Sequence, residues 1–148
     1  LERLNKLNES NSGFDTADVK KELQECMQNY FGVFRRGEFM KQGLDQLKDL
    51  KDKVDNLHLI DKSDAFNTSR VEAIELQNLF DVAEATAISA YERNESRGAH
   101  ARDDYPDRDD ENWLCHTIFD PKSKSVSKRE VNFNPSKLEA FPPKARTY

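Results

Sequence analysis

Hydrophobic residues recur at three- and four-residue spacing over three long segments of the chain, about residues 15–34, 38–57 and 69–93. Positions spaced in this way fall on one face of an α-helix, so the pattern predicts three amphipathic helices. The third segment has the broadest apolar surface and includes several alanines, which suits a central helix that is contacted on two sides. The stripes of the first two helices are Val19, Leu23, Cys26, Met27, Tyr30 and Phe34, and Met40, Leu44, Leu47, Leu50, Val54 and Leu57.

Capping signals mark where these helices begin. Asp15 is expected to cap the first helix, and Ser69 with Glu72 forms a capping box before the third. Gly32 falls inside the first helix, where we expect a close contact with another helix. The apolar stripe of the second helix is nearly heptad-like, so this helix is expected to pack almost antiparallel to a neighbour. Residues 1–96 are therefore predicted to form an antiparallel three-helix bundle.

The pattern changes beyond residue 96. Two short β-like runs, 114–119 and 126–133, flank the turn sequence DPKSKS and predict a hairpin. The last prolines of the sequence exclude regular structure near its end. We therefore predict a mainly α fold in which residues 97–148 add a loop, a short β-hairpin and an extended tail. The tail is expected to pack on the bundle or on a partner, because it carries the apolar residues Phe133, Leu138, Phe141 and Tyr148.

Charge is distributed unevenly along the chain, whose net charge is −5. Residues 122–148 contain seven basic and two acidic residues, a balance of +5, so the first 121 residues sum to −10. The overall acidity argues against nucleic acid as a partner, because phosphate binding requires clustered lysine and arginine. Two interpretations of the basic end stay open: either it docks on an acidic surface, or both surfaces are simply solvated.

Segment 94–117 concentrates the candidate chemistry. Arg97, His100 and Arg102 could bind a carboxylate ligand through the planar arginine fork, or carboxylates of a neighbouring domain, and we favour the second. Its acidic residues Asp103, Asp104, Asp107, Asp109, Asp110 and Glu111 are expected to be solvated and to cap a short helix near Asp109. No spacing of a metal site, a nucleophile or a phosphate-binding loop is present, and the two cysteines are expected to be free thiols. We therefore predict no catalytic, cofactor-binding or metal-binding residue in this chain.

Five blocks of the sequence are distinctive: CMQNYFGVFR (26–35), FNTSRVEAIELQN (66–78), ESRGAHARDDY (95–105), DDENWLCHT (109–117) and FPPKARTY (141–148). Together they resemble the C-terminal part of flavoprotein subunits of the succinate dehydrogenase family. ESRGAH is shared with the related fumarate reductase and L-aspartate oxidase flavoproteins. DDENWLCHT and the FPPKARTY ending resemble succinate dehydrogenase more specifically.

This resemblance implies a parent enzyme that oxidises succinate to fumarate. Electrons would pass through FAD to an iron–sulfur subunit, and then to quinone through membrane anchor subunits. In this family an FAD-binding domain and a capping domain precede the helical domain and hold the flavin and substrate motifs. None of those motifs occurs here, so FAD is expected to be bound outside this sequence, and the fragment alone is expected to be inactive. The parent complex is expected on the cytoplasmic side of the bacterial inner membrane, or on the matrix side in mitochondria.

The resemblance also implies a role for segment 94–117. We expect Arg97, His100 and Arg102 to pair with the FAD-binding domain of the same subunit or with the iron–sulfur subunit. Trp113 and His116 are expected to anchor the segment, so these five residues are the predicted interface.

Two alternatives to this assignment stay open. The chain could be a stand-alone helical protein-interaction module with no enzyme attached. It could also be the C-terminal domain of an L-aspartate oxidase, which would change the substrate to an amino acid and remove the iron–sulfur partner. The sequence opens on Leu1, in a leucine pattern typical of the last turns of a helix, so we expect a fragment of a longer protein.

Overall fold

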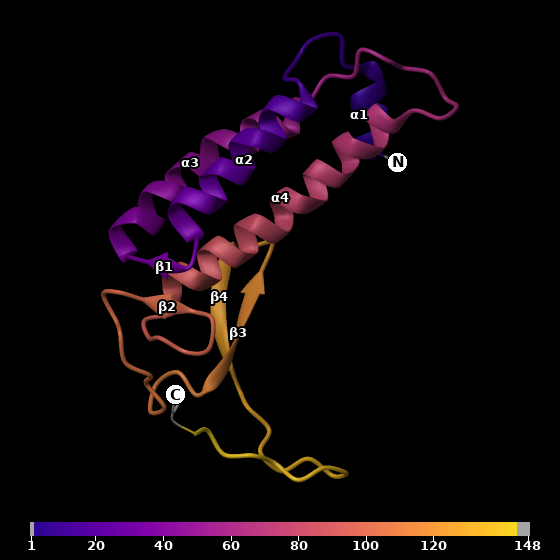
Figure 1. The fold of residues 1–148 in the computed structure, drawn as a ribbon. Coiled ribbons are helices and arrows are strands. Elements are labelled where there is room, and N and C mark those ends of the chain that lie inside the picture. The colour runs from indigo at the N-terminus through magenta and orange to yellow at the C-terminus, as the bar shows by residue number, and fades with distance from the viewer. Residues whose placement is uncertain (1, 145–148) are drawn as a thin grey trace.

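The computed structural model describes residues 2–144 and consists mainly of α-helices (Figure 1). The helices are α1 (Glu2–Glu9), α2 (Thr16–Phe31), α3 (Gly37–Asp55) and α4 (Thr68–Glu92). The strands are β1 (Phe34–Arg35), β2 (Ala101–Arg102), β3 (Cys115–Asp120) and β4 (Ser125–Glu130). The predicted mainly α fold with a short β-hairpin is thus confirmed.

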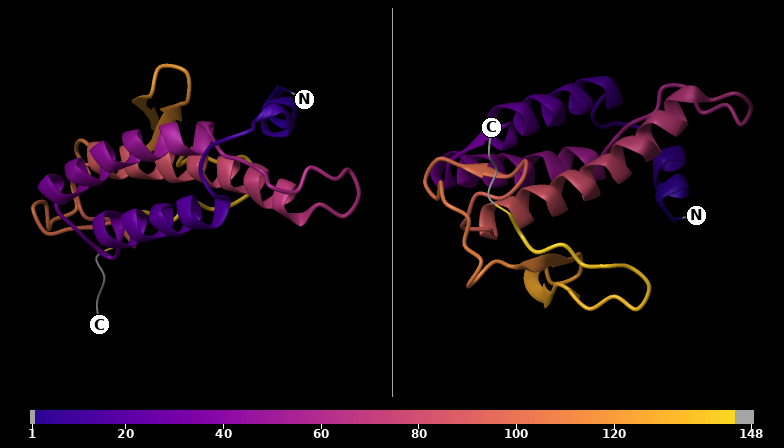
Figure 2. Two further views of the ribbon diagram at one scale, coloured as in Figure 1. Left: turned by 90° about the horizontal axis from the view of Figure 1, so that it is seen from above. Right: turned by 60° about the horizontal axis from the view of Figure 1, so that its bottom comes forward.

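The three long helices lie together as a bundle (Figure 1). Helices α2 and α4 run in one direction and α3 runs in the opposite direction, so α2 and α4 end at the same end of the bundle, beside β1 and β2. Helix α1 lies near the first half of α4, where Arg3 forms an ion pair of 3.0 Å with Asp81. The hairpin of β3 and β4 lies along α4 and projects from the bundle (Figure 2).

An apolar core fills the space between these helices. The apolar faces of the three long helices supply it, with Val19, Leu23 and Cys26 from α2, Met40, Leu47, Leu50 and Val54 from α3, and Ala73, Leu76, Phe80, Ala83, Ala87 and Ala90 from α4. The alanines of α4 are small enough for its neighbours to approach closely, as expected for the central helix. No helix within residues 2–144 is both long and apolar enough to cross a membrane.

Side chains cap the starts of two helices. Asp15 caps α2 as predicted, because its carboxylate accepts hydrogen bonds from the backbone N–H groups of Ala17 and Asp18 at 2.8 and 3.2 Å. The capping box predicted at Ser69 is wrong. Asn67 caps α4 instead, accepting from the backbone N–H of Arg70 at 2.8 Å. An asparagine amide can also donate, and Asn67 donates to two carbonyls of the preceding loop, so it fixes the loop and the helix together.

The end of α2 differs from the prediction. The helix ends at Phe31, Gly32 is its C-cap, and Phe34 lies in β1 with 78% of its surface exposed. The physical reason is that Arg35 turns back and donates to the carbonyls of Phe31 and Gly32, which replaces a further turn of helix. Strand β1 then pairs in parallel with β2, with Arg35 opposite Arg102, a contact that local sequence patterns do not predict.

The close helix contact expected at Gly32 occurs at Gly43 of α3 instead. A Cβ atom at this position would lie 2.5 Å from Cβ of Tyr30 and 2.6 Å from Cε2 of Phe31. Helices α2 and α3 therefore approach each other closely because residue 43 has no side chain.

The predicted hairpin is confirmed. Strands β3 and β4 pair antiparallel, with His116 opposite Arg129 and Phe119 opposite Val126. Lys124 in the turn adopts a left-handed backbone with a φ of 54° and forms an ion pair with Glu84 of α4. The hairpin turn is thereby tied to the bundle.

The tail has no regular structure between residues 131 and 144, as the prolines predict. Leu138 and Phe141 are 78% and 79% exposed, and Phe133 is 41% exposed. Tyr148 lies outside the described residues. The expectation that the tail packs on a partner stays a prediction, and so does the division at residue 96.

We expect Gly43→Ala to lower the free energy of unfolding by about 1–3 kcal/mol, because the added methyl group overpacks the contact with α2. Helix propensity alone would change stability in the opposite direction, by about 1 kcal/mol in favour of alanine. Urea unfolding followed by circular dichroism at 222 nm measures the sign. Gln42→Ala, on the exposed face of the same helix, is the control. A Gly43→Ala variant more stable than the parent would contradict the close approach of α2 and α3.

Candidate functional site

Segment 94–117 folds back against the ends of α2 and α4 and forms a cluster of charged residues there. Its centre is Glu95, whose side chain is fully buried. The Glu95 carboxylate accepts hydrogen bonds from Arg93 at 2.6 and 2.9 Å and from Arg97 at 2.8 and 3.0 Å. It also accepts from the backbone N–H of Asp109 at 2.8 Å. Burial acts to raise the pKa of Glu95, but these hydrogen bonds outweigh burial and hold the pKa below its ordinary value, so the carboxylate stays charged.

Arg102 joins the end of α4 to the start of α3. It is 3% exposed and forms a two-pronged ion pair with Asp104, with both N···O distances 2.7 Å. Its Nη1 donates to the carbonyls of Ala90, Tyr91 and Arg93 at 3.4, 3.0 and 3.1 Å, which satisfies the last turn of α4. Asp104 in turn accepts from the backbone N–H of Gly37, the first residue of α3, at 2.9 Å.

Arg102 and the backbone N–H of Gly37 also keep Asp104 in its charged form. The hydrogen bonds from Arg102 and, to a smaller extent, from Gly37 lower the pKa of Asp104 to about 2, against the opposing effect of burial. A carboxylate at the start of a helix is also favoured by the helix dipole. This matters for α3, because its N-cap residue Arg36 makes no side-chain capping bond.

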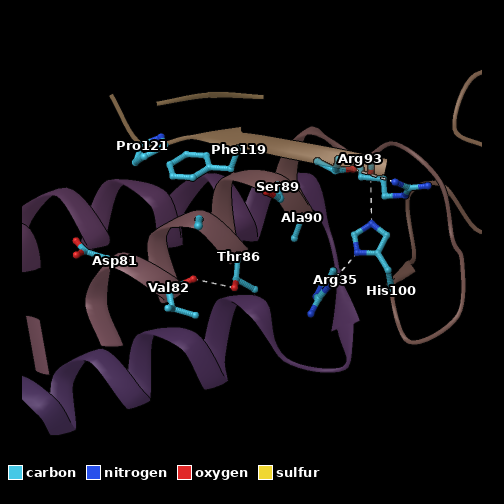
Figure 3. A pocket seen from close by; sticks show the side chains of 12 residues that line it. Arg35, Asp81, Val82, Thr86, Ser89, Ala90, Arg93, His100, Phe119 and Pro121 are labelled. Atoms are coloured by element: carbon cyan, nitrogen blue, oxygen red, sulfur yellow. Dashed lines mark hydrogen bonds between the residues drawn. The ribbon is translucent and has the colours of Figure 1, made fainter. Parts of the chain in front are cut away.

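His100 connects the ends of α2 and α4. Its Nδ1 lies 2.8 Å from Nη1 of Arg35, and its Nε2 lies 3.1 Å from the carbonyl oxygen of Arg93 (Figure 3). An arginine can only donate and a carbonyl can only accept, so Nδ1 accepts, Nε2 carries the proton and the ring is neutral. Burial lowers the pKa of His100, as do the charges of Arg35, Arg102 and Arg93, while the bond to the carbonyl acts in the opposite direction.

Arg93 attaches the hairpin to this cluster. Besides Glu95, its guanidinium binds the carbonyls of Trp113 and Cys115 at 2.5 and 3.2 Å and the hydroxyl of Thr117 at 2.9 Å. The Trp113 ring is 9% exposed, and two cations contact it: the Arg93 guanidinium, 5.4 Å from the ring centroid, and the ammonium of Lys128, at 3.6 Å. These two cation–π contacts help to hold the start of the hairpin in place.

An outer layer links the cluster to the tail. Arg97 forms an ion pair of 2.6 Å with Asp110, which also pairs with Arg108 at 2.8 Å. Arg108 in turn donates to the carbonyl of Lys144 in the tail at 2.8 Å. The hydrogen bonds to Glu95 and Asp110 raise the pKa of Arg97. Asp109 accepts from the backbone N–H groups of Glu111 and Asn112 and so caps a turn at 110–112, where a short helix was predicted.

A shallow groove of about 630 Å³ runs between α4 and the hairpin, next to this cluster (Figure 3). Its lining includes the apolar side chains of Val82, Ala85 and Phe119. Arg35 and His100 lie together at the cluster end of the groove.

The structure brings together Arg97, His100 and Arg102, which the sequence had indicated, and it places buried Trp113 beside them. His116 lies apart, exposed on β3. Sequence reasoning missed Arg35, Arg93 and Glu95. The spacing of arginine, glutamate and arginine at positions 93, 95 and 97 was a usable signal for the last two.

The side chains of the cluster can form ion pairs and hydrogen bonds. Within residues 2–144 no group of three or more histidine, cysteine or acidic side chains is arranged to hold a metal ion. Cys26 is buried, and burial raises its pKa to about 11, so its thiol stays protonated. Cys26 and Cys115 are both free thiols.

Comparison with known proteins places this arrangement among flavoproteins. A family described as "Fumarate reductase flavoprotein C-term" matches residues 20–148. The succinate dehydrogenase flavoprotein subunit of Coxiella burnetii is 43% identical over 146 residues, which cover 99% of this chain and 25% of that protein. The mitochondrial succinate dehydrogenase flavoprotein subunit of Oryza sativa is 37% identical, covering 98% of this chain and 24% of that protein.

A solved structure agrees with the sequence comparisons. The FrdA chain of E. coli quinol fumarate reductase superposes with a TM-score of 0.86 at 33% identity. The superposition covers 99% of this chain and 25% of the FrdA chain. This chain therefore spans about a quarter of the length of the relatives that it matches.

We expect Glu95→Ala to lower the free energy of unfolding by about 3–5 kcal/mol, because it leaves Arg93 and Arg97 partly buried without their shared counter-ion. Asp110→Ala is the control. Its side chain is 41% exposed, so its loss should cost about 1 kcal/mol or less. Urea unfolding would be followed both by circular dichroism and by the fluorescence of Trp113, the only tryptophan, which lies in the cluster. Equal costs for the two variants would contradict a structural role for the buried carboxylate.

We expect the stability of the chain to fall between pH 7 and pH 5 because of His100. The pKa of this ring is lowered in the folded chain, so His100 contributes stability that is fully present above its ordinary value of 6.5. That contribution is lost as the pH falls through the lowered folded-state pKa. His100→Gln, which cannot titrate, should have a shallower fall when unfolding free energies are measured across this range. His116→Gln, which replaces an exposed histidine of the hairpin, is the matched control. An unchanged slope in His100→Gln would show that the ring is not held neutral.

Proposed function

The chain belongs to the fumarate reductase and succinate dehydrogenase flavoprotein family, as its C-terminal region, and we propose that it is the helical domain of a succinate dehydrogenase flavoprotein subunit. The parent subunit oxidises succinate to fumarate and passes electrons to an iron–sulfur subunit and then to quinone. Its FAD is held by the part of the subunit that this chain does not include. The similarity over 99% of this chain to a quarter of a succinate dehydrogenase subunit supports this assignment.

Within that enzyme we assign docking and assembly to this domain, and not the chemical step. The observation that carries this role is a contrast in the surface around the cluster. The polar side chains of segment 94–117 are largely bonded to one another, whereas large apolar side chains nearby are exposed. Val82 beside the groove is 64% exposed, Ile118 on the hairpin is 38% exposed, and Leu138 and Phe141 in the tail are more exposed still. Exposed apolar surface next to a rigid polar frame is typical of a surface that binds another protein.

The five predicted interface residues divide into two groups within this proposal. Arg97, with 25% of its side chain exposed, and His116 are accessible and would contact the partner directly. Arg102, His100 and Trp113 would act by holding segment 94–117 in the shape that the partner recognises.

The partners in this proposal are the FAD-binding domain of the same subunit and the iron–sulfur subunit, with the membrane anchor subunits reached indirectly. The complex would be peripheral to the cytoplasmic side of a bacterial inner membrane, or to the matrix side in mitochondria. Nucleic acid is not a partner, consistent with a net charge of −5.

The size and location of the native protein test this proposal. An antibody raised against the chain should detect, in the membrane fraction of the source cells, a band about four times larger than 17.1 kDa, because the chain matches about a quarter of its relatives. That band should fluoresce from bound flavin after denaturation, and the membranes should oxidise succinate. The matched control is preimmune serum on the same fractions. A soluble band of 17.1 kDa would instead support a stand-alone helical module.

A further inference from the structure

Arg35 is a partly buried cation without a carboxylate partner in the described part of the chain. The other arginines of the cluster each form an ion pair: Arg93 and Arg97 with Glu95, and Arg102 with Asp104. Arg36, the neighbour of Arg35 in sequence, pairs with Asp103 at 3.1 Å. A desolvated charge is costly unless an opposite charge compensates it, so the exception at Arg35 requires an explanation.

The internal contacts of Arg35 use only part of its guanidinium. Its Nε–H donates to the carbonyls of Phe31 and Gly32, and one N–H of Nη2 donates to Phe31. One N–H of Nη1 donates to Nδ1 of His100 at 2.8 Å. Each terminal nitrogen carries two hydrogens, so one N–H on Nη1 and one on Nη2 have no partner among residues 2–144.

The surroundings of Arg35 do not neutralise its charge. The carbonyls at the end of α2 supply only the partial negative charge of a helix end. His100 is neutral, because its Nδ1 accepts from Arg35 while its Nε2 donates to a carbonyl. Arg102 lies close enough to add to burial in lowering the pKa of Arg35. The site therefore has an excess of positive charge.

This charge lies at the groove between α4 and the hairpin (Figure 3). The groove has a volume of about 630 Å³. It combines the guanidinium with the hydroxyl of Ser89 and with apolar surface from Ala85 and Phe119. A ligand with one anionic end and a short aliphatic body matches this combination.

We propose that Arg35 binds a carboxylate group in this groove through its two unpartnered N–H groups. One guanidinium offering two N–H groups matches the two oxygens and the single negative charge of a carboxylate. A phosphate carries more charge and is typically surrounded by several donors. Among residues 2–144, the other charged side chains that line the groove are Arg93 and Asp81, and both are already bonded within the chain. The carboxylate belongs either to a small aliphatic acid or to an aspartate or glutamate side chain of another protein segment. This binding does not depend on the assignment of the parent enzyme.

The test is a titration of the 148-residue chain at pH 7, followed by the NMR signals of the arginine Nε–H groups and of the His100 ring. The probes are sodium propionate and the doubly blocked amino acid N-acetyl-aspartate amide, with sodium chloride at matched ionic strength as the salt control. Saturable shifts of Arg35 and His100 are expected with at least one of the two carboxylates and not with chloride. Tighter binding of the blocked aspartate would identify a protein side chain as the ligand, and tighter binding of propionate would identify a small acid.

Three variants separate the site from general effects. Arg35→Lys keeps the charge but loses the two-pronged fork, so binding should weaken about tenfold. Ser89→Phe fills the groove and leaves every bond of Arg35 intact, so it should also weaken binding even if Arg35→Lys folds poorly. Arg36→Gln removes an adjacent, more exposed guanidinium and should bind as the parent does.

Three results would overturn the proposal. The first is the absence of saturation by about 100 mM of either carboxylate, a concentration that would saturate a site with a dissociation constant near 10 mM. The second is an equal shift with chloride. The third is binding that Ser89→Phe leaves unchanged, or that Arg36→Gln weakens as much as Arg35→Lys does.

Discussion

The backbone carbonyls at the ends of α2 and α4 lie at the same end of the bundle. Their need for hydrogen-bond donors determines where Arg35, Arg102 and His100 lie. A helix leaves its last carbonyls without partners inside the helix, and a buried carbonyl without a donor is costly. Arg35 supplies donors to the end of α2, and Arg102 supplies them to the end of α4. Each guanidinium also brings a positive charge to the negative end of a helix dipole, which strengthens the bond. His100 bridges the two systems, so both helix ends are held as one unit.

Several arginines lie close together in the cluster, so their positive charge must be compensated by negative charge. Glu95 compensates Arg93 and Arg97, because its fully buried carboxylate is shared by both. Asp104 compensates Arg102 and at the same time satisfies the first N–H of α3. Buried ion pairs of this kind contribute less to net stability than to specificity, because desolvation offsets much of their attraction. Their effect here is to give segment 94–117 one conformation, with Arg93 and Trp113 setting the start of the hairpin against α4.

As a result, one end of the bundle is held in a fixed shape, and exposed apolar surface lies beside it. The cluster lies at one end of the groove and is hydrogen-bonded to both the hairpin and the tail. Its hydrogen bonds therefore set the relative placement of these three features. Exposed apolar groups such as Val82 and Phe141 are presented on this frame. Arg35 adds an uncompensated charge at the end of the groove. A domain built in this way can dock by surface complementarity while its own shape stays fixed, which suits the proposed place of the chain beside a flavin domain and an iron–sulfur subunit.

The sequence by itself determined the three long helices, the hairpin, the irregular tail and the cap at Asp15, because each depends on spacing or residue preference within a few neighbouring positions. It also marked Arg97, His100 and Arg102 as belonging together, since they lie in one short segment. Only the tertiary structure decided their partners. From the sequence alone, charged residues such as Glu95 and Arg35 are expected to be solvated. Glu95 becomes buried and Arg35 partly buried only when distant helix ends meet. The same holds for Gly43, where the close approach is made by α2, and for Phe34, which leaves the apolar face because Arg35 ends the helix. Hydrophobic periodicity depends only on neighbouring positions in the sequence. The pairing of charges and the hydrogen bonds to the carbonyls at the helix ends depend on how the helices pack in the bundle.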